Sequence, residues 1–147
     1  MITKGIHSIS KGRRKGYFSR DKIQQDYNVL EGARQRILYL LDNFSHFYVS
    51  FSGGKDSGVL LNLTIQESKK RGRLPVDVLI VDFEAQYHET HAFIERMVLR
   101  GEVNPYWVCL PLSLRNSISQ FQPKWLCWDP DKKAQWVREV PQHEGVI

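Results

Sequence analysis

Three short apolar runs, separated by stretches of helical periodicity, constrain most strongly what this chain can fold into. The runs cover residues 47–51, 76–81 and 106–110 and are rich in the aromatic and β-branched residues that favour strands. Because strands and helices alternate, the pattern predicts an α/β fold with an open, mainly parallel sheet and helices on both faces. Three strands make a small sheet, so we expect a truncated relative of a larger domain or one that another subunit completes.

The remaining periodicity predicts helices at about 29–44, 57–70 and 90–100, and a short helix at 112–120. Asn28 is expected to cap the first helix. We expect a basic arm at residues 1–26 and a single domain at 27–147. The apolar residues expected to face the core from the three longer helices are Val29, Leu30, Ala33, Ile37, Leu40, Leu41, Phe44, Val59, Leu60, Leu61, Leu63, Phe93, Ile94, Met97 and Val98.

One loop carries most of the chemical information in the chain. It follows the first predicted strand, opens the second helix and has the sequence Ser52-Gly53-Gly54-Lys55-Asp56-Ser57. Glycines let the backbone approach an anion, and the free N–H groups at a helix start point toward that anion. The hydroxyls and the lysine add donors, whereas the aspartate suits a metal ion or a helix cap. The loop predicts phosphate binding, with an ordinary glycine-rich turn as the alternative.

The loop differs in spacing from a Walker A motif, which has a glycine six residues before its lysine and a serine or threonine after it. Val49 and Asp56 occupy those two positions here. Ser52 and Asp82 each follow the end of a predicted strand. Ligands of open parallel sheets bind at that edge, so both residues belong to the predicted site.

These residues resemble a known family. The loop is similar to the pyrophosphate loop of the adenine nucleotide alpha hydrolase superfamily, which includes N-type ATP pyrophosphatases and phosphoadenosine phosphosulfate reductases. Residues 81–90, VDFEAQYHET, resemble the reductase-like signature in which an aspartate ends the second strand and a Glu-Thr pair opens the next helix. The whole chain, including WLCWDPDK at 125–132, looks most like phage and prophage reductase-like proteins described as co-activators of prophage gene expression.

The resemblance implies an adenine nucleotide, either ATP or a molecule like phosphoadenylyl sulfate. Its phosphates would lie in the 52–57 loop and its adenine against Val81, Asp82 and Phe83. In the pyrophosphatases, ATP is cleaved between its α and β phosphates with Mg²⁺ present, and a substrate is adenylated. Lys55 would then stabilise developing phosphate charge, and Asp56 would help to hold the metal. These two residues are the candidate catalytic residues.

The chain also departs from the sulfonucleotide reductases. Those enzymes use a cysteine in a Glu-Cys-Gly-like segment, and some relatives carry iron–sulfur cysteine pairs; this sequence has Cys109 and Cys127 in neither setting. We therefore rank an ATP-cleaving, substrate-adenylating enzyme first. A non-catalytic nucleotide-binding regulator that acts with a DNA-binding protein comes second, and sulfonucleotide reduction comes last.

Composition adds limits on location and partners. The chain is 41% hydrophobic and 25% charged, as in ordinary globular proteins. No apolar run is long enough to span a bilayer, and the N-terminus lacks the apolar core of a signal peptide, so we expect a cytoplasmic protein. Residues 1–22 contain many lysines and arginines with Asp21 as the one acid, which predicts either nucleic-acid contact or a solubilising tail.

Two side-chain groups admit more than one interpretation. His88 and His91 are three residues apart and could share a helix face, although a solvated helix start is favoured over zinc. Packing in a core or between subunits is favoured over base stacking for a tryptophan cluster. Basic residues beside that cluster face either a phosphate-bearing substrate or solvent. The cluster consists of Trp125, Trp128 and Trp136, with Lys132, Lys133 and Arg138 beside it.

Overall fold

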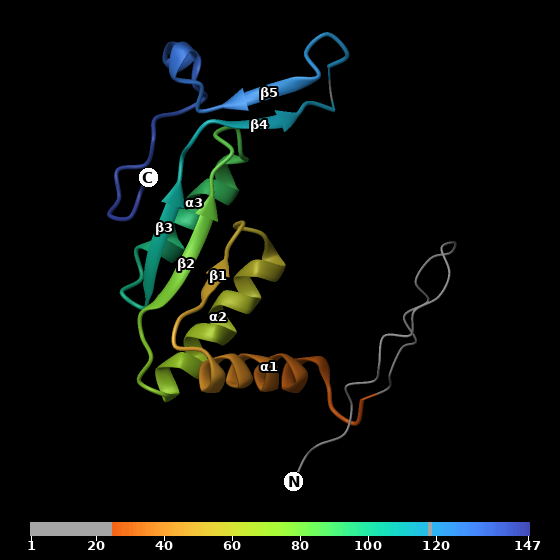
Figure 1. Cartoon of the computed structure of the whole chain (residues 1–147), viewed down its shortest axis with the longest axis vertical. Coiled ribbons are helices and arrows are strands. Elements are labelled where there is room, and N and C mark those ends of the chain that lie inside the picture. The colour runs from red at the N-terminus through yellow and green to blue at the C-terminus, as the bar shows by residue number, and fades with distance from the viewer. Residues whose placement is uncertain (1–24, 118) are drawn as a thin grey trace, which may run out of the picture.

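The computed structural model describes residues 25–117 and 119–147 (Figure 1). Its larger sheet contains β1 (Tyr48–Ser50), β2 (Val76–Val81) and β3 (Val103–Val108), all parallel and in that order. Helices α1 (Val29–Asn43), α2 (Lys55–Lys70) and α3 (His88–Val98) precede the three strands in turn. The predicted α/β class and parallel sheet are confirmed. Most of the predicted basic arm lies outside the described residues.

The helices that pack on the sheet lie on one face of it. Both crossovers run in the same direction, because β2 lies beside β1 and β3 beside β2. Right-handed connections made in one direction place their helices on the same side. Accordingly, α2 and α3 share a single core cluster with the alternate residues Val76, Val78 and Ile80 of β2. The expected second helical layer is not found among the described residues, where α1 packs against α2.

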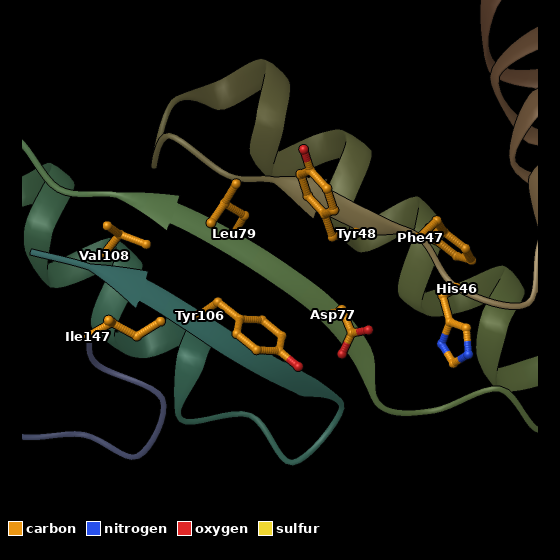
Figure 2. A pocket seen from close by; sticks show the side chains of 8 residues that line it. All are labelled: His46, Phe47, Tyr48, Asp77, Leu79, Tyr106, Val108 and Ile147. Atoms are coloured by element: carbon orange, nitrogen blue, oxygen red, sulfur yellow. The ribbon is translucent and has the colours of Figure 1, made fainter.

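The opposite face of the sheet carries an apolar hollow of about 480 Å³ (Figure 2). It is built from the residues that alternate with the core positions of the strands. Asp77 lies at its edge, where one carboxylate oxygen accepts a 2.7 Å hydrogen bond from the side-chain amide of Asn104. The lining residues are His46, Phe47, Tyr48, Asp77, Leu79, Tyr106, Val108 and Ile147. This hollow lies over the sheet and is distinct from the predicted phosphate loop.

The outer edge of β3 is covered by the last residues of the chain. The Trp107 N–H donates to the Gly145 carbonyl at 2.8 Å, and the Ile147 N–H donates to the Trp107 carbonyl at 2.8 Å. β3 begins three residues before its predicted start because Pro105 does not interrupt it. Backbone N–H groups alternate sides along a strand, so the N–H that Pro105 lacks would point away from β2.

A β-hairpin replaces the short helix predicted at 112–120. Strands β4 (Leu112–Arg115) and β5 (Lys124–Cys127) pair antiparallel, and the 3-10 helix η1 (Pro130–Gln135) follows them. The helix prediction is wrong because pairing with residues 124–127 decides the structure of 112–115, and the pattern within one segment does not specify its partner strand. In the described ranges, no helix is long and apolar enough to cross a bilayer.

The helices bury narrower faces than their apolar patterns predict. Asn28 caps α1 as expected, accepting a 2.9 Å hydrogen bond from the Glu31 N–H. In α1, Ile37 and Leu41 are buried. In α2, which begins two residues before its predicted start, Leu61 is buried. The predicted core residues that are instead exposed are Val29, Leu30, Leu40, Phe44, Val59 and Leu60. Which apolar residues are buried depends on contact with one sheet face and one neighbouring helix, and sequence periodicity does not specify those contacts.

We predict that Gly145→Ala destabilises the fold by about 2 kcal/mol or more. Gly145 has φ +84°, and an added Cβ would lie 2.0 Å from the Pro105 carbonyl oxygen. The matched control is Gly101→Ala, because no atom lies within 4 Å of its added Cβ. We expect the control to change the free energy of unfolding by about 0.5 kcal/mol or less. Urea denaturation measures both, and equal stability of the two variants would contradict the packing of the C-terminal residues on β3.

Candidate functional site

The predicted phosphate loop joins β1 to α2 and is shaped by its two serines. The Ser57 hydroxyl donates to the Gly54 carbonyl at 3.0 Å and lies 3.1 Å from the Ser52 hydroxyl. The Ser52 N–H donates to the Ser57 Oγ at 3.3 Å. The two serines therefore close the loop on itself. The glycines between them complete a tight strand-to-helix turn.

The N-terminus of α2 is open toward solvent. Gly54 is the N-cap residue, and no side chain among the described residues caps the first turn. The backbone N–H groups at such a helix start lack intrahelical acceptors and attract anions. Lys55 and Asp56 lie in this first turn with both side chains exposed. Asp56 therefore does not serve as the cap, which was one of its two predicted roles.

Gly53 brings the loop against the first turns of α3. Its φ is +75°, and an added Cβ would lie 2.7 Å from the Thr90 Cγ2 and 2.9 Å from the Ile94 Cγ1. Glycine is therefore required both by the backbone angle and by the close packing. Gly54 differs, since its added Cβ would meet the Ser52 Oγ at an ordinary 3.4 Å. The structure thus brings Thr90 of the Glu89-Thr90 pair beside the loop.

The side chain of Asp82 points into the protein. It is 1% exposed, and its carboxylate accepts hydrogen bonds from the Trp107 indole at 2.7 Å and from the Glu84 N–H at 2.7 Å. Its neighbours Val81 and Phe83 are 37% and 38% exposed. Of the three residues expected beside an adenine, Val81 and Phe83 are thus accessible, whereas the Asp82 carboxylate is enclosed by protein donors.

Glu84 was not predicted to have a role, yet it anchors the residues that follow the hairpin, 128–147, which form the C-terminal segment. It is 4% exposed, and its carboxylate accepts from the Trp128 N–H at 2.6 Å and the Val137 N–H at 3.0 Å. Its φ of +64° is unfavourable for a non-glycine residue, at a cost of about 1–3 kcal/mol. Two charge-assisted hydrogen bonds, each contributing roughly 1.5–3 kcal/mol, offset that cost.

Arg138 completes this buried polar cluster. Its Nη2 lies 2.5 Å from both carboxylate oxygens of Asp82, and its Nε donates to the Glu84 carbonyl at 3.1 Å. The guanidinium also lies over the Trp128 ring, 5.0 Å from its centroid. The sequence left two interpretations for Arg138, which were contact with a phosphate-bearing substrate and exposure to solvent. The structure shows neither, because the guanidinium is bound to Asp82 and Glu84. A buried carboxylate at the end of a strand needs a cation as its partner. The sequence does not identify Arg138, 56 residues away, as that cation.

The tryptophans serve packing, as predicted. Trp128 is 2% exposed, and its indole N–H donates to the Asp82 carbonyl at 3.0 Å. Its ring meets Trp136 edge to face at 5.1 Å. Lys133 lies over the Trp136 ring. The favoured interpretation of the cluster is therefore confirmed for Trp128, which fastens η1 to the end of β2.

His88 and His91 both lie in the first turns of α3. His88 is exposed, while the ring of His91 lies 5.5 Å from that of the buried Trp107. Burial lowers the pKa of His91, and the nearby Arg138 guanidinium lowers it further. Within residues 25–117 and 119–147, no three side chains of metal-binding type gather at one place. A magnesium ion at Asp56 would therefore need phosphate oxygens and water as its other ligands, which is its usual mode beside nucleotides.

Neither cysteine lies in surroundings that activate a thiol. Burial raises the pKa of Cys109 to about 12, and the Asp82 carboxylate nearby adds to the effect. Burial also raises the pKa of Cys127, whose Sγ donates to the Leu112 carbonyl at 3.3 Å. Since the thiolate is the nucleophile, both groups are poorly suited to attack a substrate at neutral pH.

We predict slow alkylation of both cysteines in the folded protein. At pH 8, a pKa of about 12 leaves on the order of one Cys109 thiol in ten thousand ionised. Iodoacetamide labelling followed by mass spectrometry, with urea-unfolded protein as the control, measures the difference. Because these pKa values are raised, labelling should accelerate as pH rises above 8. Rapid labelling of Cys109 at pH 7 would contradict the burial described here.

Comparison with known proteins places these features in a family. Residues 46–136 match the model of the phosphoadenosine phosphosulfate reductase domain, a span that includes the loop, Asp82, Glu84 and the hairpin. The chain is 44% identical over 124 residues to a protein of Escherichia coli (strain K12) described as "Uncharacterized protein YbdN". That alignment covers 82% of this chain and 30% of the relative, so the chain spans about a third of the relative's length.

No solved structure matches the chain significantly. The family match nevertheless covers more than half of the chain, and it includes every residue predicted for the nucleotide site. The chain belongs to the phosphoadenosine phosphosulfate reductase domain family.

Proposed function

We propose that the chain binds an adenine nucleotide, ATP first among the candidates, with its phosphates at the start of α2. The observation that carries the proposal is the uncapped helix N-terminus, which directly follows a parallel strand and a glycine held at positive φ. The family supports a nucleotide-related role. The exposed ammonium of Lys55 lies in the same first turn and supplies a cation for the phosphates.

The base would rest on the exposed part of the turn after β2. Val81 and Phe83 are partly accessible there, and the aromatic ring of Phe83 offers a surface for stacking. The Asp82 carboxylate is engaged with Trp107 and Arg138, so it would not recognise the base directly. Recognition would then depend on the Phe83 ring and on backbone groups of the turn.

We further propose cleavage of ATP between its α and β phosphates, with adenylation of an acceptor. Lys55 would stabilise the negative charge that develops on the phosphates. Asp56 would hold Mg²⁺ together with phosphate oxygens, and that ion would neutralise charge on the leaving pyrophosphate. The raised pKa values of both thiols weigh against sulfonucleotide reduction by Cys109 or Cys127. A regulator that binds nucleotide without turnover is the second candidate, and turnover distinguishes the two.

We predict that Gly54→Val and Lys55→Ala each reduce ATP affinity at least roughly tenfold while the protein stays folded. Gly54 has φ −79° and ψ 163°, which valine adopts readily, and its added Cβ would meet only the Ser52 Oγ, at 3.4 Å, so we expect the variant to fold with a bulky side chain in the proposed phosphate site. Isothermal titration calorimetry with ATP and Mg²⁺ measures affinity, and circular dichroism checks the fold. Lys124→Ala, an exposed lysine of β5, is the matched control. Unchanged ATP affinity in both loop variants would contradict the assignment of the loop as the phosphate site.

We also predict pyrophosphate release when ATP and Mg²⁺ are supplied with the right acceptor. A coupled pyrophosphatase assay that detects phosphate, run over a panel of acceptor molecules and repeated with EDTA, measures the release. Loss of the signal in EDTA and in Asp56→Asn supports the enzyme. Tight ATP binding without pyrophosphate from any acceptor selects the non-catalytic regulator.

A further inference from the structure

One guanidinium holds both ends of the turn that follows β2. The Arg138 Nη2 contacts the Asp82 carboxylate at 2.5 Å, and its Nε donates to the Glu84 carbonyl at 3.1 Å. Phe83 is the residue between these two anchor points. A further backbone bond, from the Ala85 N–H to the Phe83 carbonyl at 2.7 Å, tightens the turn.

Phe83 is exposed, although the residues on both sides of it are buried. Asp82 and Glu84 are 1% and 4% exposed, whereas Phe83 is 38% exposed. The direction of the exposed ring is therefore set by two buried neighbours, which Arg138 holds through the Asp82 carboxylate and the Glu84 carbonyl. Movement of either anchor would turn the ring, because adjacent backbone angles determine where a side chain points.

We propose that Arg138 is a positioning residue for the nucleotide base. It acts through the turn 82–84, holding the Phe83 ring at the angle needed to stack on the base, and touches no part of the nucleotide. The inference rests on the proposed nucleotide binding described above. It assigns a role in ligand recognition to the segment after the hairpin, which lies far from the phosphate loop in sequence.

The geometry favours arginine over lysine at this position. The guanidinium meets a carboxylate and a carbonyl from different atoms while its Cζ lies over the Trp128 ring, 5.0 Å from the centroid. An ammonium is a single point of charge and cannot reproduce a planar fork that contacts two acceptors and stacks on an aromatic ring. A lysine would keep the charge opposite Asp82 and lose the second anchor at Glu84.

The test compares two ligands that share phosphates and differ in the base. ATP would use both the loop and the Phe83 ring, whereas inorganic tripolyphosphate would use the loop alone. Calorimetry of both ligands with Mg²⁺ is run on the parent chain, Arg138→Ala, Arg138→Lys and Phe83→Ala. Arg115→Ala, an exposed arginine of β4, is the matched control. Phe83→Ala removes the ring and leaves the buried anchors intact, so it covers the case in which Arg138→Ala does not fold.

We expect Arg138→Ala and Phe83→Ala to weaken ATP binding by roughly tenfold to a hundredfold, since loss of one base–aromatic stacking contact has effects of about that size. Tripolyphosphate affinity should stay unchanged in both, and Arg138→Lys should fall between Arg138→Ala and the parent for ATP. The inference is overturned if Arg138→Ala, shown by circular dichroism to be folded, weakens both ligands equally, or neither, or if Phe83→Ala binds ATP like the parent. Absence of ATP binding in the parent chain would instead refute the proposed function itself.

Discussion

The buried ion pair between Asp82 and Arg138 is the interaction on which the carboxyl edge of the sheet depends. It joins the end of β2 to a segment 56 residues later, with both carboxylate oxygens within 2.5 Å of one guanidinium nitrogen. Removing one partner of such a buried pair typically costs about 3–5 kcal/mol, a large share of the roughly 5–15 kcal/mol that stabilises a whole domain. The pair therefore contributes strongly to holding the segment after the hairpin on the end of β2.

Glu84 extends the same constraint to the main chain. Its carboxylate receives the N–H groups of residues 128 and 137, which bracket η1. The Asp82 carboxylate thus accepts from a guanidinium, an indole and the Glu84 N–H, whereas the Glu84 carboxylate accepts from two backbone N–H groups of the segment after the hairpin. On the other side of the site, Gly53 places the loop directly against Thr90 and Ile94 of α3. The loop and the turn after β2 are both held by buried contacts, while their exposed groups stay free to meet a ligand.

The sequence predicted the parts of this architecture that local physics determines. The three strands, the helix start at the glycine pair and the cap at Asn28 follow from residue type and spacing, because each depends on neighbours within a few residues. Val59 and Leu60 were misassigned to the core because the buried face of α2 is chosen by its sheet and helix neighbours. The partnership of Arg138 with Asp82 could not be predicted, since the two meet only after the chain has crossed β3 and the hairpin. The hairpin was missed because cross-strand pairing with β5, and not the pattern within 112–120, decides the structure there.

The cluster around Asp82 has an optical consequence. Of the four tryptophans in the chain, Trp107 and Trp128 are buried and donate their indole N–H groups to the carboxylate and the carbonyl of this one residue. Near-ultraviolet circular dichroism arises from aromatic rings held in fixed, asymmetric surroundings and is lost when packing loosens. Undocking of the C-terminal segment would release the Trp128 ring and would remove His143, which stacks on the Trp107 ring at 5.8 Å between centroids. The protein thus carries its own spectroscopic reporter of whether that segment is seated on the end of β2.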